Sequence, residues 1–320
     1  MNFDWADLAF GSKKPIKELK ATFITAPRDI SSNRLKQLLK GYLPKGNIIL
    51  GISKEKYVVG FENQPQFKML QQKDVQTLVD QVTASKSPHK LYTLSYSQRE
   101  LGYIFEKVSF REVLLVNGSW QNSFHTTVPY YALVKAQIPF TYVSAFCDEA
   151  EAKNYEKSAD KLIPNVTTNK PNKYTEEELL TMALQVAKAS YDFTFQIGVV
   201  LAKRTGNAYQ LLDSAFNKVV PYQTYAMLNG ASREQNFSPV NDQNHYDTVH
   251  AETMLIIKAA EQGTNLRGMS LFINVLPCPT CARMLSQTAI SEIVYSQDHS
   301  DGYAVRMLEQ SGKKVRRIVL

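Results

Sequence analysis

Hydrophobic and polar positions alternate differently on the two sides of a polar stretch near residue 170. Before it, short runs of β-branched and aromatic residues predict strands, and hydrophobic residues spaced three or four apart predict helices between them. Strands alternating with helices are typical of an α/β domain. The predicted strands cover 20–26, 47–52, 56–61, 90–96, 112–118 and 140–146, with helices over 31–43 and 73–84.

The polar stretch itself is rich in Asn, Thr, Lys and Pro and has little hydrophobic periodicity, which is typical of a linker. We therefore predict a separate Rossmann-like α/β domain over residues 1–158, a linker over 159–172 and a second domain over 173–320. No glycine-rich nucleotide-binding pattern occurs in the first domain. Its role is left open by the sequence.

The second domain begins with Thr175 and Glu178 in the spacing of a capping box, followed by a helical pattern to residue 191. Two strand patterns then flank Gly206, which predicts a β-hairpin. A long polar loop follows over 218–247. The remaining pattern predicts helices over 250–262, 279–288 and 303–312 and strands over 269–276, 292–296 and 315–320, the last two strands being parallel because a helix separates them.

Charge is distributed unevenly along the 320 residues. The net charge is +7, and residues 1–170 carry 23 Lys and Arg against 16 Asp and Glu, whereas residues 171–320 carry 14 of each. Such an excess can attract a polyanion, so nucleic-acid binding through the first half stays open. The chain has no signal-peptide pattern, no run of about 18 apolar residues and only three cysteines. We expect a soluble, cytoplasmic protein with no membrane contact.

Two of the cysteines, Cys278 and Cys281, lie three residues apart where a predicted strand runs into a predicted helix. Pro277 ends the strand and Pro279 begins the helix. This spacing lets both sulfurs bind one metal ion, although a redox pair or two small core residues would also fit it. His250 precedes a second helix upstream and supplies a third ligand. One His and two Cys with an open fourth position is an arrangement found in catalytic zinc sites.

Glu252 stands two residues after His250, at the start of an otherwise apolar helix. An unpaired carboxylate in a buried helix costs several kcal/mol, so its presence favours a functional role. It need not bind the metal, yet it lies within reach of a water on the metal. We therefore predict that Glu252 is a general acid and base.

The segments "HAE" at 250–252 and "PCPTC" at 277–281 together match the H-x-E and P-C-x-x-C signature of zinc-dependent nucleobase deaminases. Over residues 174–320 the chain resembles the cytidine deaminase-like superfamily, and its tail is similar to the deoxycytidylate (dCMP) deaminase branch. The resemblance implies a three-layer α/β/α sandwich with a five-stranded mixed sheet. It also implies a zinc ion, a nucleotide substrate and a homo-oligomer.

The resemblance implies hydrolytic deamination. Zinc on His250, Cys278 and Cys281 activates a water, Glu252 transfers its proton to the ring nitrogen, and ammonia leaves. Asn217 falls where the family places an asparagine that binds sugar or base, although it could equally be a turn residue after a strand. The candidate substrate contacts are Asn217, Ala251, Arg233 and Tyr303. His299, Tyr222 and Tyr225 are weaker candidates, since solvated or packing roles are more common.

Three other functions remain open at this level. The same chemistry could act on cytidine or adenosine within RNA or DNA, which the basic first half favours. The zinc site could instead be structural in a nucleotide-binding protein, but a structural site has no use for Glu252. A redox role for Cys278 and Cys281 would leave His250 and Glu252 unexplained.

Overall fold

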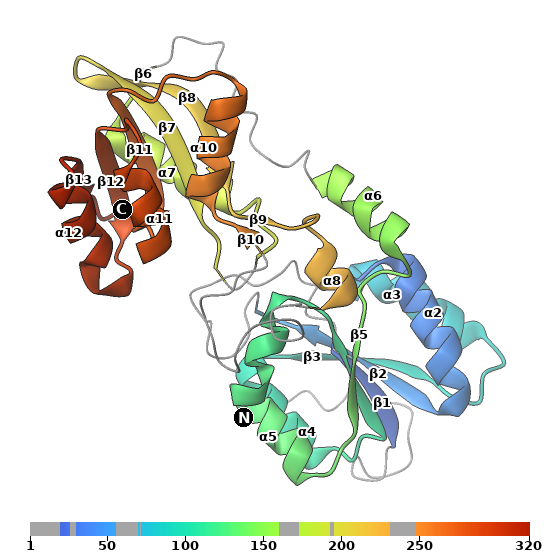
Figure 1. The fold of residues 1–320 in the computed structure, drawn as a ribbon. Coiled ribbons are helices and arrows are strands. Elements are labelled where there is room, and N and C mark those ends of the chain that lie inside the picture. Colours follow the sequence, from blue (N-terminus) through green and yellow to red (C-terminus); the bar gives the residue numbers. More distant parts are fainter. Residues whose placement is uncertain are drawn as a thin grey trace. The chain divides into compact units, whose positions relative to one another are not determined.

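The computed structural model describes residues 20–25, 30–55, 70, 72–159, 173–192, 195–230 and 248–320. Contacts divide the chain into two compact units, Met1–Asn154 with Thr224–His245, and Tyr155–Gln223 with Tyr246–Leu320. Each unit is built on its own large sheet (Figure 1). Residues 224–230, which the sequence pattern assigns to the second domain, therefore group with the N-terminal unit.

The N-terminal unit contains a five-stranded sheet in the order β3-β2-β1-β4-β5. Every neighbouring pair of these strands is parallel. The strands are β1 (Ala21–Thr25), β2 (Asn47–Ser53), β3 (Leu91–Tyr96), β4 (Glu112–Val116) and β5 (Phe140–Val143). All five residues of β1 are buried, as expected for a parallel sheet covered on both faces. The predicted strand over 56–61 lies outside the described residues.

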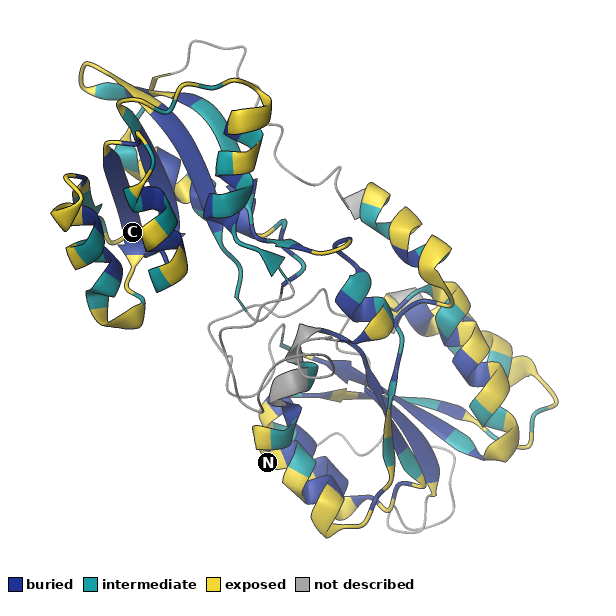
Figure 2. Cartoon of the chain, viewed as in Figure 1, coloured by how far each residue is buried: buried dark blue, intermediate teal, exposed yellow. Residues whose placement is uncertain are grey.

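Five helices connect the strands of this unit or follow the last of them: α2 (Ser32–Tyr42), α3 (Gln72–Ala84), α4 (Leu101–Lys107), α5 (Val128–Lys135) and α6 (Glu149–Ala159). Helices α2 and α3 confirm the predicted helices over 31–43 and 73–84, whereas α4, α5 and α6 were not predicted. Figure 2 shows the consequence for burial, because β1, β2 and β4 are mostly buried while the outer sides of the helices are exposed. The described chain thus has an α/β fold in its first half.

The second unit contains a six-stranded mixed sheet in the order β13-β12-β11-β7-β8-β6. The prediction of five strands was wrong by one, because the two-residue strand β6 (Lys173–Tyr174) pairs antiparallel with the free edge of β8. The predicted hairpin is confirmed, as is the parallel pairing of the last two strands. The other strands are β7 (Gly198–Thr205), β8 (Ala208–Phe216), β11 (Met269–Val275), β12 (Glu292–Gln297) and β13 (Lys314–Arg317).

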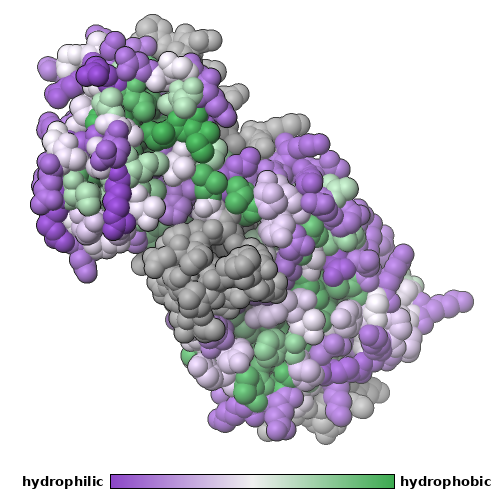
Figure 3. Space-filling model, viewed as in Figure 1, coloured by the Kyte–Doolittle hydropathy of each residue, from purple (hydrophilic) through white to green (hydrophobic). Residues whose placement is uncertain are grey.

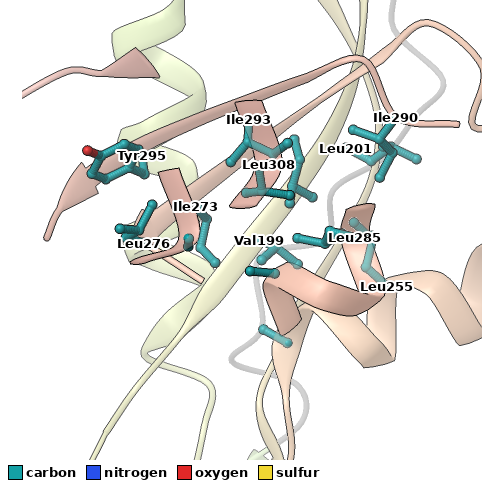
Figure 4. Close-up of a cluster of buried hydrophobic side chains, with 14 of the residues drawn as sticks. Val199, Leu201, Leu255, Ile273, Leu276, Leu285, Ile290, Ile293, Tyr295 and Leu308 are labelled. Atoms are coloured by element: carbon teal, nitrogen blue, oxygen red, sulfur yellow. The ribbon is translucent and has the colours of Figure 1, made fainter. Parts of the chain in front are cut away.

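Helices cover both faces of this sheet and make three layers. Helix α7 (Glu176–Ala187) buries Leu179, Leu180 and Ala183 against one face. The other face packs against α10 (Ala251–Glu261), α11 (Pro279–Ser286) and α12 (Tyr303–Gln310). Figure 4 shows the core on that side, where Leu255, Leu285 and Leu308 from the three helices meet Val199 and Ile273 from the sheet. Helices α10 and α11 are thereby fixed with their first residues at one end of the sheet.

The predicted polar loop over 218–247 contains structure that the pattern does not reveal. Strand β9 (Lys218–Val219) pairs antiparallel with β10 (Thr248–Val249), and α8 (Tyr225–Asn229) lies between them in sequence. Lys218 is opposite Val249 in this pair. Residues 231–247 lie outside the described part of the chain.

The surface agrees with the ordinary globular composition. Figure 3 shows mainly hydrophilic residues on the visible face, with hydrophobic residues in interrupted patches. Within the described residues, no helix combines the length and the apolar character needed to cross a lipid bilayer.

Candidate active site

Three potential metal ligands converge at the starts of two helices. His250 is the N-cap residue of α10, and Cys278 is the N-cap residue of α11, with Pro279 as the first helical residue. Nδ1 of His250 lies 3.6 Å from Sγ of Cys278 and 3.3 Å from Sγ of Cys281. All three ligand atoms lie within 4.8 Å of one another. The sequence-predicted ligands are therefore brought together.

These separations fit a zinc ion. Zn–S bonds of about 2.3 Å and Zn–N bonds of about 2.1 Å at tetrahedral angles place neighbouring ligand atoms roughly 3.6–3.8 Å apart. The observed 3.3 and 3.6 Å separations are close to this value. Two sulfurs and one imidazole nitrogen also form a donor set that zinc prefers.

Electrostatics around the three side chains favour a thiolate. The pKa of Cys278 is lowered to about 4, because its sulfur accepts hydrogen bonds from the Cys281 thiol and from His250. The backbone N–H of Cys281 also donates to Cys278 Sγ at 3.4 Å, which is an N-cap interaction at α11. The pKa of His250 is raised, chiefly by its hydrogen bond with Cys278. A metal cation would stabilise the thiolates further.

Glu252 lies in the first turn of α10 and is only 3% exposed. Burial raises the pKa of its carboxyl group, which also lies within hydrogen-bonding reach of Cys281. A carboxyl group whose pKa is shifted towards neutrality is suited to both accepting and donating a proton. Its position beside the metal ligands is the arrangement that the sequence predicts for an acid and base.

Asn217 follows β8 and lies in the wall of the same pocket. Its Oδ1 accepts a hydrogen bond from the backbone N–H of Ile197 at 2.8 Å. Its Nδ2 donates to the carbonyl of Phe195 at 2.8 Å and to Oδ2 of Asp192 at 3.3 Å. Since β9 and β10 pair immediately after Asn217 and immediately before His250, the small sheet holds these two residues at the same pocket.

The pocket joins the potential metal ligands to an aromatic wall. It contains about 420 Å³ of empty volume, open solvent included. The rings of Phe195 and His299 lie with their centroids 5.6 Å apart and their planes tilted by 43°. The lining residues are Asp192, Phe195, Ile197, Asn217, Thr248, His250, Glu252, Val275, Leu276, Cys278 and His299.

The other predicted substrate contacts either do not line the pocket or lie outside the described residues. Ala251 is completely buried in the hydrophobic core behind the site. Tyr303 begins α12, where the guanidinium of Arg283 lies 5.6 Å from its ring centre, and it is not among the residues that line the pocket. Arg233 lies outside the described residues. The roles of these residues stay predictions.

Six lining residues were not predicted from the sequence: Asp192, Phe195, Ile197, Thr248, Val275 and Leu276. Asp192 and Phe195 belong to the segment between α7 and β7, which has no recognisable motif. The only signal was a cluster of aromatic residues beside one acid in "SYDFTF". Such clusters are usually packing residues, so the pattern alone could not identify them. Tyr222, a weaker candidate, is buried and does not line the pocket.

Comparison of the sequence with known proteins points to a zinc-binding region, as the geometry of this site does. Residues 173–297 match the family model described as "Cytidine and deoxycytidylate deaminase zinc-binding region". A "Probable deoxycytidylate deaminase" from Drosophila melanogaster is 26% identical over 167 residues, which are 50% of this chain and 79% of that protein. The deoxycytidylate deaminase of Pongo abelii is 25% identical over 166 residues, which are 48% of this chain and 86% of that protein.

Among solved structures, the dCMP deaminase from the cyanophage S-TIM5 aligns with a TM-score of 0.34 and 20% identity, covering 45% of this chain and 96% of that one. The family match and the curated relatives identify the C-terminal part of this chain as a hydrolase of the nucleotide deaminase class. Residues 1–172 lie outside the family match.

Proposed function

We propose that this chain deaminates a cytosine-type base in a nucleotide such as dCMP. The premise is that residues 173–297 match the zinc-binding region of cytidine and deoxycytidylate deaminases. Water replaces the exocyclic amine, and ammonia is released. The observation that carries this proposal is the convergence of His250, Cys278 and Cys281 on one point, with the buried Glu252 beside them.

His250, Cys278 and Cys281 would hold the zinc ion, and His250 and Cys278 also line the pocket. When bound, zinc supplies a Lewis acid that makes a water nucleophilic at neutral pH. Metal binding requires both cysteines as thiolates, and the backbone N–H of Cys281, which donates to Cys278 Sγ at 3.4 Å, favours the Cys278 thiolate.

Glu252 performs the proton transfers. Its carboxylate takes a proton from the attacking water and delivers it to the ring nitrogen, while a C–O bond forms at the carbon that bears the amine. A second proton passes through Glu252 to the departing amine, the C–N bond breaks and ammonia leaves. The buried position of Glu252 keeps bulk water away from these transfers.

Asn217, Phe195 and His299 orient the substrate. Both N–H groups of the Asn217 amide are used within the protein, so the group that it offers to a sugar hydroxyl is the second lone pair of Oδ1. The paired rings of Phe195 and His299 provide an apolar surface beside a bound base. Arg233 and Tyr303 remain candidates for contacts to the phosphate and the sugar.

One observation favours a second substrate class. The excess of positive charge in residues 1–170 would attract a polynucleotide, so that cytidine or adenosine within RNA or DNA becomes the substrate. A nucleotide-binding protein with a structural zinc site is the non-catalytic alternative. We also propose a cytoplasmic location, which the three free cysteines support, and a homo-oligomeric state.

The test is ammonia release by the zinc-loaded protein on dCMP, dCTP, deoxycytidine, cytidine, adenosine, single-stranded DNA and tRNA. Glu252→Gln keeps the shape of the side chain, and Glu261→Gln, on the exposed side of the same helix, is the matched control. We expect turnover of one free nucleotide that falls about 10²- to 10⁴-fold in Glu252→Gln and is unchanged in Glu261→Gln.

The other outcomes separate the alternatives. Turnover that is confined to single-stranded DNA or tRNA would replace the nucleotide by a polynucleotide substrate. Zinc binding without any turnover would favour the structural-zinc alternative. Turnover that survives in Glu252→Gln would remove that residue from its assigned role.

A further inference from the structure

Basic residues gather at one edge of the N-terminal sheet. Because all five strands are parallel, the segments that lead into them lie at the same edge, which we call the amino edge. The described parts of these segments are residue 20 and residues 42–46, 84–90, 107–111 and 135–139, counted from the end of each preceding helix. Their charged residues are all basic: Lys20, Lys45, Lys86, Lys90, Lys107, Arg111 and Lys135.

The opposite edge of the sheet has no such excess. In the described segments that follow the strands, the bases Lys54 and Arg99 stand against the acids Glu55, Glu100 and Asp148. The basic residues of the amino edge are all exposed, and none of them forms an ion pair with another described residue. Their positive charge is therefore available to an anionic partner.

Hydrogen bonds join four segments of the amino edge. The N–H of Arg111 donates to the carbonyl of Ala21 at 2.9 Å, and its guanidinium donates to the carbonyl of Lys45. The N–H of Lys90 donates to Oδ1 of Asn47 at 2.9 Å. Neighbouring strands of a sheet lie about 4.8 Å apart, so the five strand starts form a row roughly 19 Å long. The positive charges are thus spread along a line instead of being gathered around one point.

A groove opens between α2 and α3 beside this row. Part of its lining comes from the segments that lead into β2 and β3, which also carry Lys45 and Lys90. Its charged lining residues are Lys36 and Lys40, both exposed on α2, and none of the described lining residues is acidic. The groove therefore offers apolar contacts next to positive charge. Its apolar lining residues are Leu39, Leu43, Pro44, Leu78, Val82 and Pro88.

A single-stranded nucleic acid has both features that this surface complements. Its phosphates repeat along a line and are attracted to Lys and Arg, and its unpaired bases expose flat faces to apolar side chains. A duplex keeps those faces stacked inside, and a lone phosphate is held by donors that converge on one point. An acidic peptide would match the charge but would have no bases for the groove.

We propose that the N-terminal unit binds single-stranded nucleic acid at this surface, with phosphates along the basic residues of the amino edge and bases in the groove between α2 and α3. Lys45 and Lys90 are central to the surface, because the segments that carry them belong to both the row and the groove. The inference goes beyond the proposed function and does not rest on it, since binding by this unit requires no deamination.

The test measures binding of a fluorescein-labelled 20-nucleotide oligothymidylate to the full-length zinc-loaded protein by fluorescence anisotropy. Thymine carries no exocyclic amine, so the probe cannot be deaminated. Each phosphate that a protein neutralises on a single strand adds about 0.7 to the slope of log K against log salt concentration. We expect a slope of about −3 or steeper for the wild type, which corresponds to at least about four phosphates.

Matched double variants locate the binding surface. Lys45→Gln with Lys90→Gln removes two charges before β2 and β3, whereas Lys54→Gln with Arg99→Gln removes two exposed charges beyond the other ends of the same strands. In the first variant we expect a slope that is less steep by about 1.4 and binding that is about 10- to 30-fold weaker at 0.1 M salt. The second should bind like the wild type. Equal losses in the two variants would overturn the inference.

Competitors test the role of the groove. An abasic strand of the same length and polyglutamate lack bases, so we expect both to compete at least about fivefold less well than oligothymidylate. If either competes equally well, the groove takes no bases and the inference is overturned. An active deaminase that fails to bind oligothymidylate overturns this inference alone, whereas a protein that binds the strand and deaminates nothing overturns only the proposed function.

Discussion

The backbone N–H of Ile197 donates a 2.8 Å hydrogen bond to Oδ1 of Asn217, which ties the entry to β7 to the end of β8 at the wall of the pocket. Asn217 completes this arrangement by donating to the carbonyl of Phe195 and to Asp192. One buried side chain thus fixes the segment that supplies three pocket residues, Asp192, Phe195 and Ile197. Asn217 therefore has a structural role that does not depend on a bound substrate.

Asn217→Ala should lower the free energy of unfolding by about 1–3 kcal/mol, because the buried N–H of Ile197 and the carbonyl of Phe195 each lose their partner. Urea denaturation of the zinc-loaded protein measures this change. Asn154→Ala, at an exposed position of α6, is the control. A loss of stability no larger than that of the control would show that Asn217 does not organise the pocket wall.

Cys281→Ser should abolish tight zinc binding, because the variant removes one of three ligand atoms that lie within 4.8 Å of one another. We expect the purified variant to contain well under one zinc per chain by elemental analysis. Cys147→Ser changes an exposed thiol in the N-terminal unit and should bind zinc like the wild type. Equal zinc content in both variants would contradict the assignment of the ligands.

Gly198→Ala should destabilise the second unit by about 1–3 kcal/mol, since a Cβ atom at this position would lie 2.1 Å from the carbonyl oxygen of Ala183 in α7. Gly41 in α2 has no atom within 4 Å of the corresponding position, so Gly41→Ala should leave stability unchanged or raise it slightly. Thermal unfolding of the two variants is the measurement. The prediction fails if the two substitutions have the same effect.

Acid should weaken one ion pair that joins α7 to β13. The Arg316 guanidinium holds the pKa of Glu176 down to about 2, with a further hydrogen bond from the Tyr209 hydroxyl. Because the pKa is lowered on folding, the ionised group stabilises the fold above its unfolded pKa, and this contribution is lost as the pH falls towards 2. Glu176→Gln lacks the contribution at every pH.

The wild type should therefore exceed Glu176→Gln in stability by about 2 kcal/mol at pH 6, and the difference should shrink steadily between pH 5 and pH 2.5. Urea unfolding at a series of pH values gives the difference. Glu177→Gln changes the exposed neighbouring acid and should follow the wild type throughout. A pH-independent gap between wild type and Glu176→Gln would contradict the role of the ionised pair.

Much of the second unit was predictable because its signals are local. The capping box at Thr175 and Glu178 forms as expected, and both helices of the candidate site begin within one residue of the predicted positions, at Ala251 and Pro279. Metal-ligand chemistry depends on residue type and short spacing, which the sequence displays directly. The alternation of strands and helices in the N-terminal unit was readable for the same reason, since the hydrophobic period is a property of neighbouring residues.

The sequence by itself determined the order of the helices and strands, the candidate zinc ligands and the position of Glu252. Only the tertiary structure decided the rest of the pocket, because Asp192, Phe195 and His299 meet through contacts between segments about a hundred residues apart. It alone placed residues 224–230 on the N-terminal sheet. A five-residue helix is too short to show a clear hydrophobic period in the sequence. Its stability comes from hydrogen bonds to residues far away in the sequence, and no local pattern predicts those pairings.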